Sequence, residues 1–172
     1  MRSRARLFGH AVHPALIVFP LGLLATSVIF DILYLITGDD GYTIASTYMI
    51  GAGILAGLLA GLVGLIDWLA VPPGTRARRI GAWHGLGNVG VLALFAVSWL
   101  RHSGYGASPG IVALIFSLAG VGLATVTGWL GRELVERLGV GVDPGAGPNA
   151  PSSLHGQPIP AAGPAEPGYP TR

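Results

Sequence analysis

The sequence predicts an all-α integral membrane protein: a four-helix transmembrane bundle with a disordered C-terminal tail. Three observations predict this fold class. Charged residues make up only 10% of the 172 residues and hydrophobic residues 51%, whereas soluble domains carry about 25% charged residues. Four apolar stretches are long enough to cross a bilayer, which takes about 20 helical residues. From residue 139 the chain is instead rich in Pro, Gly, Ala and Ser and has almost nothing to bury.

The predicted spans follow one another with short connections, and each contains at most one Asp, Glu or Arg. They are residues 14–37, 43–71, 80–101 and 109–131. The first span contains Asp31, the second has Asp67 near its end, and the third has His84 near its start. The predicted domains are a cytoplasmic N-terminal segment, a transmembrane domain and a disordered cytoplasmic tail, over residues 1–13, 14–138 and 139–172.

The distribution of arginine predicts that both termini are cytoplasmic. The chain has no lysine, and eight of its arginines fall before the first span, between the second and third spans, or after the fourth: Arg2, Arg4, Arg6, Arg76, Arg78, Arg79, Arg132 and Arg137. The opposite connections hold only Arg101, together with Asp39 and Asp40. The positive-inside rule therefore predicts a multi-pass protein of the bacterial inner membrane, with the lipid bilayer as its first partner. The net charge of +2 is too small to indicate a nucleic-acid partner.

Helical spacing places small or polar residues along one face of every span, which favours close packing of the helices. The stripes are Pro20, Ser27 and Asp31; Gly53, Gly57, Ala60, Gly64 and Asp67; Gly81, His84, Gly85 and Asn88; and Ser117, Gly120, Ala124, Gly128 and Gly131. At 1.5 Å per residue, His84 lies roughly 6 Å and Asp67 roughly 7 Å inside the cytoplasmic ends of their helices. The hairpin of the second and third spans therefore predicts that Asp67 lies close to His84.

The polar side chains converge at the cytoplasmic end of the predicted bundle. His10, His13, Asp67, His84 and Arg132 come from all four spans or their flanks and lie at similar depth. At the opposite end Asp31 lies level with Arg101 and His102, which predicts an interfacial ion pair rather than a functional site.

Three stretches resemble a bacterial family of membrane proteins called domain of unknown function 2231. They are "GHAVHPALIVFPLGLLATSVIFDILY", "GLVGLIDWLAVPPGTRARRIG" and "WHGLGNV", and the resemblance covers residues 7–138. It implies a polytopic membrane fold. Because some relatives are fused to Rieske iron–sulfur domains, it also implies an electron-transfer context with a redox or membrane protein partner. Where some relatives carry a second histidine just before the "FP" pair, this chain has Val18.

One interpretation of the convergent residues is a site for haem b, which helical bundles hold between histidines on facing helices. His13 and His84 would be the ligands, Asp67 would accept the second ring N–H of His84, and Arg132 would meet a propionate. Since a residue before proline avoids helical geometry, a turn rather than a helix is expected to position His13. The sequence alone assigns no cofactor.

Three other interpretations stay open. His10, His13 and His84, together with Asp67, are candidate ligands for zinc or iron. Asp67 and His84 could instead conduct protons or ions. In the last interpretation the chain is a non-catalytic membrane scaffold or partner subunit whose polar residues only fix helix packing. With no cysteine and no nucleophile constellation, nothing in the sequence indicates a hydrolase or a transferase.

Overall fold

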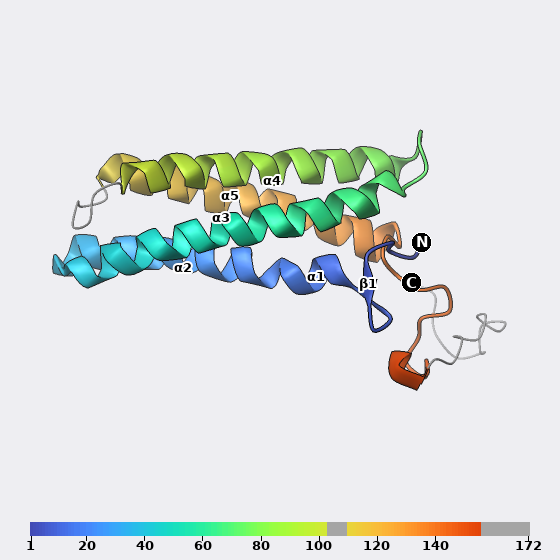
Figure 1. Cartoon of the computed structure of the whole chain (residues 1–172). Coiled ribbons are helices and arrows are strands. Elements are labelled where there is room, and N and C mark those ends of the chain that lie inside the picture. The colour runs from blue at the N-terminus through green and yellow to red at the C-terminus, as the bar shows by residue number, and fades with distance from the viewer. Residues whose placement is uncertain (103–109, 156–172) are drawn as a thin grey trace, which may run out of the picture.

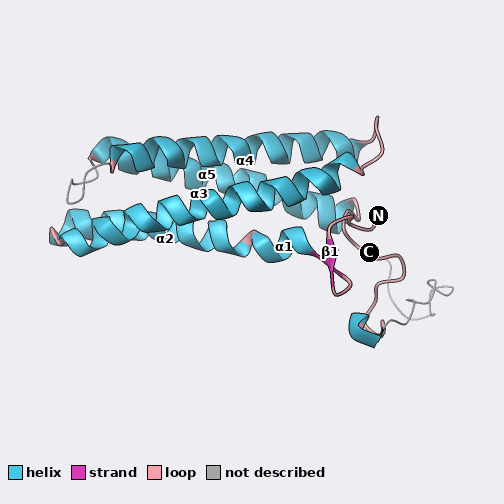
Figure 2. Cartoon of the chain, viewed as in Figure 1, coloured by secondary structure: helices cyan, strands magenta, loops and turns pink. Residues whose placement is uncertain are grey.

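Four long helices run side by side in the computed structural model, which describes residues 1–102 and 110–155 (Figures 1 and 2). In chain order the elements are β1 (Arg6–Leu7), β2 (His10–Ala11), α1 (Val12–Leu16), α2 (Val18–Thr37), α3 (Asp40–Leu69), α4 (Arg76–Arg101), α5 (Ile111–Arg132), the π-helix η1 (Glu133–Arg137) and the 3-10 helix η2 (Ser153–His155). The β-hairpin and the α3–α4 connection lie at one end of the bundle, here called the near end, and the α2–α3 connection lies at the other, the far end (Figure 1).

All four predicted spans are present as helices long and apolar enough to cross a membrane: Val12–Thr37, Asp40–Leu69, Arg76–Arg101 and Ile111–Arg137. Many large apolar side chains on these helices are exposed, among them Leu58, Leu62 and Ile115. Water would oppose that exposure, but lipid tails do not. The chain is therefore a membrane protein with an all-α fold.

Local capping explains why the helices begin earlier than the hydropathy pattern indicates. α3 begins at Asp40 because the Asp39 side chain accepts a hydrogen bond from the Gly41 amide at 2.8 Å. α4 begins at Arg76 because the Thr75 hydroxyl accepts one from the Arg78 amide at 3.2 Å. Such caps satisfy backbone donors at a helix start that have no partner within the helix. The predicted start of the fourth span, at residue 109, lies outside the described residues.

His13 belongs to a helix, which corrects the expectation that a turn positions it. It is the second residue of α1, and Pro14 follows within the same first turn. Proline is tolerated there because its missing N–H would have no intrahelical partner anyway. α1 therefore aims the His13 side chain, and α2 continues the same span after Ile17.

The bundle is built from two helical hairpins, α1/α2 with α3 and α4 with α5. Apolar side chains from all four spans form its core, namely Leu24, Val28, Ile50, Val91, Phe95 and Leu114. Glycines allow the close approach that the small-residue stripes predict. A methyl group added at Gly53 would lie 2.7 Å from Leu24, and one added at Gly120 would lie 2.7 Å from Phe95. Packing within each hairpin thus depends on glycine opposite a large side chain.

Arginine also fixes the α3–α4 connection at the near end. The Arg78 guanidinium lies 4.0 Å from the centre of the Trp68 ring. It also donates to the carbonyls of Trp68, Leu69 and Val71 at 3.1, 3.3 and 2.8 Å. Trp68 and Leu69 are the last residues of α3 and Val71 follows it, so these carbonyls have lost the regular helical hydrogen bond from four residues on. Arg78 therefore serves as a C-terminal cap for α3 as well as a positive charge in this connection.

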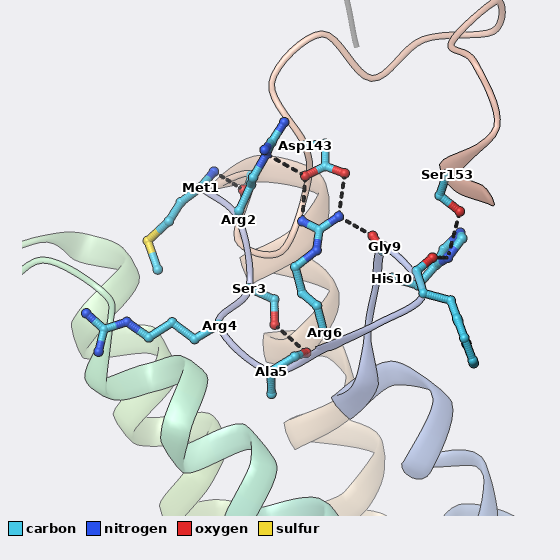
Figure 3. Close-up of polar contacts among 12 residues, drawn as sticks. Met1, Arg2, Ser3, Arg4, Ala5, Arg6, Gly9, His10, Asp143 and Ser153 are labelled. Carbon is cyan, nitrogen blue, oxygen red and sulfur yellow. Dashed lines mark hydrogen bonds and ion pairs between the residues drawn. The ribbon is translucent and has the colours of Figure 1, made fainter. Parts of the chain in front are cut away.

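The N-terminal segment folds back over the near end and contacts the segment after α5 (Figure 3). The Arg2 and Arg6 side chains pair with Asp143 at 2.9 and 2.7 Å, and the Gly141 amide donates to the Met1 carbonyl at 2.8 Å. The hydrogen bond from Arg6 lowers the pKa of Asp143. Residues 139–155 of the predicted disordered tail are described and make these contacts, whereas residues 156–172 of that prediction lie outside the described residues.

Candidate functional site

His13 is held against the backbone of α3. Its Nδ1 lies 2.9 Å from the Ala60 carbonyl oxygen. Gly64 faces the ring one turn further along, where an added methyl group would lie 3.0 Å from Cε1 of His13. Since a carbonyl can only accept, Nδ1 must carry the proton, and Nε2 of the neutral ring is then left as the acceptor. Among the described residues, no hydrogen bond reaches this Nε2.

His84 is held against α5 in the same way. Its Nδ1 donates to the Thr127 carbonyl at 2.8 Å, and a methyl group at Gly131 would lie 3.0 Å from its Cε1. Asn88, one turn along α4, donates to the His84 carbonyl at 2.8 Å and places the same amide nitrogen 3.3 Å from the Nε2 of His84. The Thr127 hydroxyl in turn donates to the Asn88 side chain at 3.2 Å.

The two imidazoles meet across the interface of the two hairpins. Their ring centroids are 6.4 Å apart and their planes are close to perpendicular, at 86°. Both rings carry their proton on Nδ1, so neither Nε2 can donate a hydrogen bond to the other ring. The arrangement brings together two basic nitrogens, each belonging to an imidazole oriented by a backbone carbonyl. That is the tautomer and support that histidine ligands of metals use.

Asp67 does not make the expected direct contact with His84. Its Oδ2 accepts from the Ser3 hydroxyl at 2.6 Å, and its Oδ1 accepts from the amides of Arg4 and Ala5 at 2.7 and 3.0 Å. Both oxygens are therefore occupied by the N-terminal segment. The role predicted for Asp67, holding the second ring nitrogen of His84, is filled by the Thr127 carbonyl.

The remaining predicted site residues lie apart from the histidine pair's contacts. The His10 ring is exposed and contacts the Phe8 carbonyl and the Ser153 hydroxyl at 3.2 and 3.3 Å (Figure 3). Arg132, whose side chain is 73% exposed, pairs with Glu136 at 3.0 Å. In the part of the chain that the structure describes, no three His, Asp or Glu side chains gather as a metal site requires. The predicted set of His10, His13 and His84 is thus not assembled.

Two partners of the histidine pair escape sequence reasoning. The carbonyls of Ala60 and Thr127 belong to the backbone, so no residue type marks them. Asn88 does leave a signal, since it follows His84 by four residues and shares its helical face. Sequence patterns can find such an asparagine, but they do not show which backbone oxygens face a histidine on another helix.

At the far end, Asp31 pairs with His102, as predicted, at 2.9 Å between Oδ1 and Nε2. Both side chains are fully buried in the bundle. The exposed Arg101 makes no ion pair among the described residues. The Nδ1 of His102 donates to the Ser98 carbonyl at 2.8 Å. Oδ2 of Asp31 is buried and has no hydrogen-bond partner among the described residues.

Comparison with known proteins yields one match. A family model described as "Predicted membrane protein (DUF2231)" matches residues 9–144, which contain the four helices and both histidines of the pair. No curated protein and no solved structure matches the chain.

Proposed function

The chain belongs to the DUF2231 family of predicted membrane proteins, and we propose that it is a haem b-binding subunit of a membrane redox system. His13 and His84 are the residues that would hold the haem. One observation carries this proposal: two imidazoles from different hairpins lie 6.4 Å apart, each with Nδ1 bound to a backbone carbonyl. Histidines used only for packing have no need of this shared tautomer.

The spacing of the two rings fits ligation of one metal from two sides. A bond from a first-row metal to imidazole is about 2 Å long, and the ring nitrogen lies about 1 Å from its centroid, which predicts centroids about 6 Å apart. The observed separation is 6.4 Å. The rings are also seated where a side chain larger than glycine would displace them, because Gly64 and Gly131 line them.

The number of protein ligands favours haem over a bare ion. Zinc or non-haem iron requires three or more protein ligands, and the described residues supply only the two histidines here. Haem iron needs only axial ligands from the protein. The donor set present therefore suits a metal that arrives with its own macrocycle.

The proposed cofactor supplies one-electron transfer, and the chain's own residues hold and tune it. The carbonyls of Ala60 and Thr127 fix the ring orientation and increase ligand basicity. Asn88 approaches only His84, so the two sides of the site differ. Arg132, at the near end of the bundle, is the proposed partner for a propionate.

The membrane placement is part of the same proposal. The arginines of the near end support a bacterial inner-membrane protein with both termini in the cytoplasm. The histidine pair then lies toward the cytoplasmic side, where a redox or membrane protein partner would exchange electrons with it.

The test is an absorption spectrum of the full chain, purified in detergent from cells well supplied with haem. We expect a b-type spectrum that sharpens on reduction with dithionite and is lost in both His13→Ala and His84→Ala. His10→Ala, which removes an exposed histidine at the same end, is the matched control and keeps the spectrum. A folded but colourless protein would overturn the proposal and leave the scaffold interpretation.

A further inference from the structure

The first helices of the two hairpins carry equivalent residues at one constant spacing. His13 and His84 are 71 residues apart, and so are Asp31 and His102. The same spacing relates two further pairs that are buried in the bundle: Leu24 with Phe95, and Ser27 with Ser98. Two of these four pairs, His13 with His84 and Leu24 with Phe95, also make matching contacts with the second helix of their hairpin.

The second helices repeat the partners of these residues at a spacing of 67. Gly53 packs on Leu24 as Gly120 packs on Phe95, with 2.7 Å for an added methyl group in both cases. The Ala60 and Thr127 carbonyls accept from His13 and His84, and Gly64 and Gly131 face the same two rings. The two hairpins are therefore repeats of one unit. The histidine and the carbonyl that it bonds are 47 residues apart in the first hairpin and 43 apart in the second.

Both repeats run in the same direction, because the first helix of each starts at the near end (Figure 1). Parallel repeats of this kind are related by an axis along the membrane normal. Residues related by a two-fold axis can contact each other only beside it. The contacts of His13 with His84 and of Asp31 with His102 thus place the axis through both pairs, one at each end of the bundle.

The far-end pair differs from the near-end pair in holding a proton. Nδ1 of His102 donates to the Ser98 carbonyl, so its Nε2 can donate to Asp31 only when the ring carries a second proton. The alternative places that one proton on Asp31. In both arrangements a single proton lies between Oδ1 and Nε2.

Removing that proton would leave the pair in an unfavourable state. A neutral ring can then make only one of its two hydrogen bonds, so a nitrogen lone pair faces either Oδ1 of Asp31 across 2.9 Å or the Ser98 carbonyl across 2.8 Å. Oδ2 of Asp31 has no donor among the described residues. A buried, unpaired charge is costly, and moving the helices apart so that water reaches it removes the cost. Binding of the proton therefore favours the arrangement in which the far ends of the two hairpins are together, and that arrangement favours binding of the proton.

We propose that Asp31 and His102 form a proton-binding site on the axis between the two repeats, which keeps the far ends of the hairpins together while it holds one proton. The step is simple uptake from water, in which the proton binds at Nε2 of His102 or at Oδ1 of Asp31. Release returns the proton to water and separates the ends.

Each hairpin helix buries at least one hydroxyl side chain. These are Ser27 on α2, Thr43 and Ser46 on α3, Ser98 on α4 and Ser117 on α5. The charged residues nearest along the chain are Asp39, Asp40 and Arg101, and all three are exposed. Burial lowers the pKa of His102, but its hydrogen bonds to Asp31 and Ser98 and the charge of Asp31 outweigh this, so that the pKa is raised.

The test is a pH titration of the full chain in lipid nanodiscs with ¹⁵N-labelled histidine, whose shifts report whether each ring is neutral or charged. Above the ordinary histidine pKa of about 6.5, we expect either His102 to stay charged or Asp31, read from the ¹³C shift of its carboxyl group, to stay protonated. A pKa of His102 that is raised in the folded state means that the protonated ring stabilises the fold. Thermal stability should therefore fall as the pH rises through that pKa. If His102 is neutral and the Asp31 carboxyl is ionised at that pH, the proposal is wrong, and this result needs no variant.

Two variants separate the site from its surroundings. Asp31→Asn should make His102 titrate at lower pH and remove the alkaline loss of stability. Exchange of the two residues, Asp31→His with His102→Asp, should restore both properties, because the axis makes the positions equivalent. Parallel stability curves for the wild type and Asp31→Asn would contradict the site, and failure of the exchanged variant to recover would contradict the axis.

Discussion

The hydroxyl of Ser3 donates to Oδ2 of Asp67 at 2.6 Å, across 64 residues of sequence. With the amides of Arg4 and Ala5 on the other oxygen, Asp67 anchors the N-terminal segment to the end of α3. The carboxylate sits near the end of a membrane span, where an ionised group needs partners. Its partners come from the segment that precedes all four spans.

Asp67→Asn should release this N-terminal segment. Hydrogen bonds to a charged group contribute about 1.5–3 kcal/mol each, so we expect amide exchange at Arg4 and Ala5 to quicken by roughly 10- to 100-fold. Hydrogen exchange followed by mass spectrometry measures this. Asp39→Asn, which removes a helix cap at the far end, is the control and should leave both amides unchanged. Equal exchange in the wild type and Asp67→Asn would show that the anchor lies elsewhere.

Gly64→Ala should destabilise the near end, because its methyl group would lie 3.0 Å from the His13 ring. Overpacking of this kind costs about 1–3 kcal/mol. Gly61→Ala, on the same helix with open space around it, should instead gain up to about 1 kcal/mol from the better helix propensity of alanine. Unfolding in detergent gives both values. If the two variants shift stability in the same direction, Gly64 does not seat the ring.

The same comparison can be made in the second hairpin. Gly131→Ala should behave like Gly64→Ala, since a methyl group there would lie 3.0 Å from the His84 ring, and Gly128→Ala is the open control. Unfolding of the two variants, measured as above, should again differ in sign. A difference found in one hairpin only would weaken the equivalence of the two repeats.

Arg78→Lys should lower stability although it keeps the charge. Lysine cannot reproduce the planar group that contacts Trp68 and three carbonyls at once. We expect a loss of about 1–2 kcal/mol, the size of one or two net hydrogen bonds. Thermal unfolding measures it, and Arg79→Lys in the same connection is the charge-matched control. Equal effects of the two variants would mean that only the positive charge matters.

Acid should separate the N-terminal segment from the segment after α5. The pKa of Asp143 is lowered from its ordinary 3.8 by the hydrogen bond from Arg6. A lowered carboxyl pKa means that the contact is present above pH 3.8 and is lost as the pH falls through the depressed value. NMR of the arginine side chains should show Arg6 losing its ordered signal only in that acid range. In Asp143→Asn the signal should be weak at every pH, and a transition near neutral pH would assign the effect to another group.

Hydropathy and charge predict the fold well, because lipid demands long apolar helices that satisfy their own backbone. The four spans and the membrane character follow from this demand alone. The sequence also brings His13 and His84 to one level, because each lies toward the near end of the first helix of its hairpin. Capping by Asp39 and Thr75 shifts helix starts by a few residues, a local effect that apolar periodicity does not register.

The pairing of polar groups was harder to predict. Asp67 and His84 lie at similar depth, but depth does not show which way each side chain points around its helix axis. The N-terminal segment also competes for the carboxylate of Asp67. The partners of both histidines in the pair are backbone carbonyls, which every residue has. The common level of Asp31, Arg101 and His102 predicts an ion pair, but it does not show which of the two basic residues is the partner or that the pair is buried.

The contact between Arg6 and Asp143 also sets an order of events during synthesis. The two residues are 137 positions apart, and a ribosome that adds about 5–20 residues per second needs on the order of ten seconds to cover that stretch. Arg6 is therefore without its partner Asp143 while all four helices are synthesised. Until then its positive charge is free to interact with anionic lipid headgroups, which would hold the start of the chain at the membrane surface during insertion.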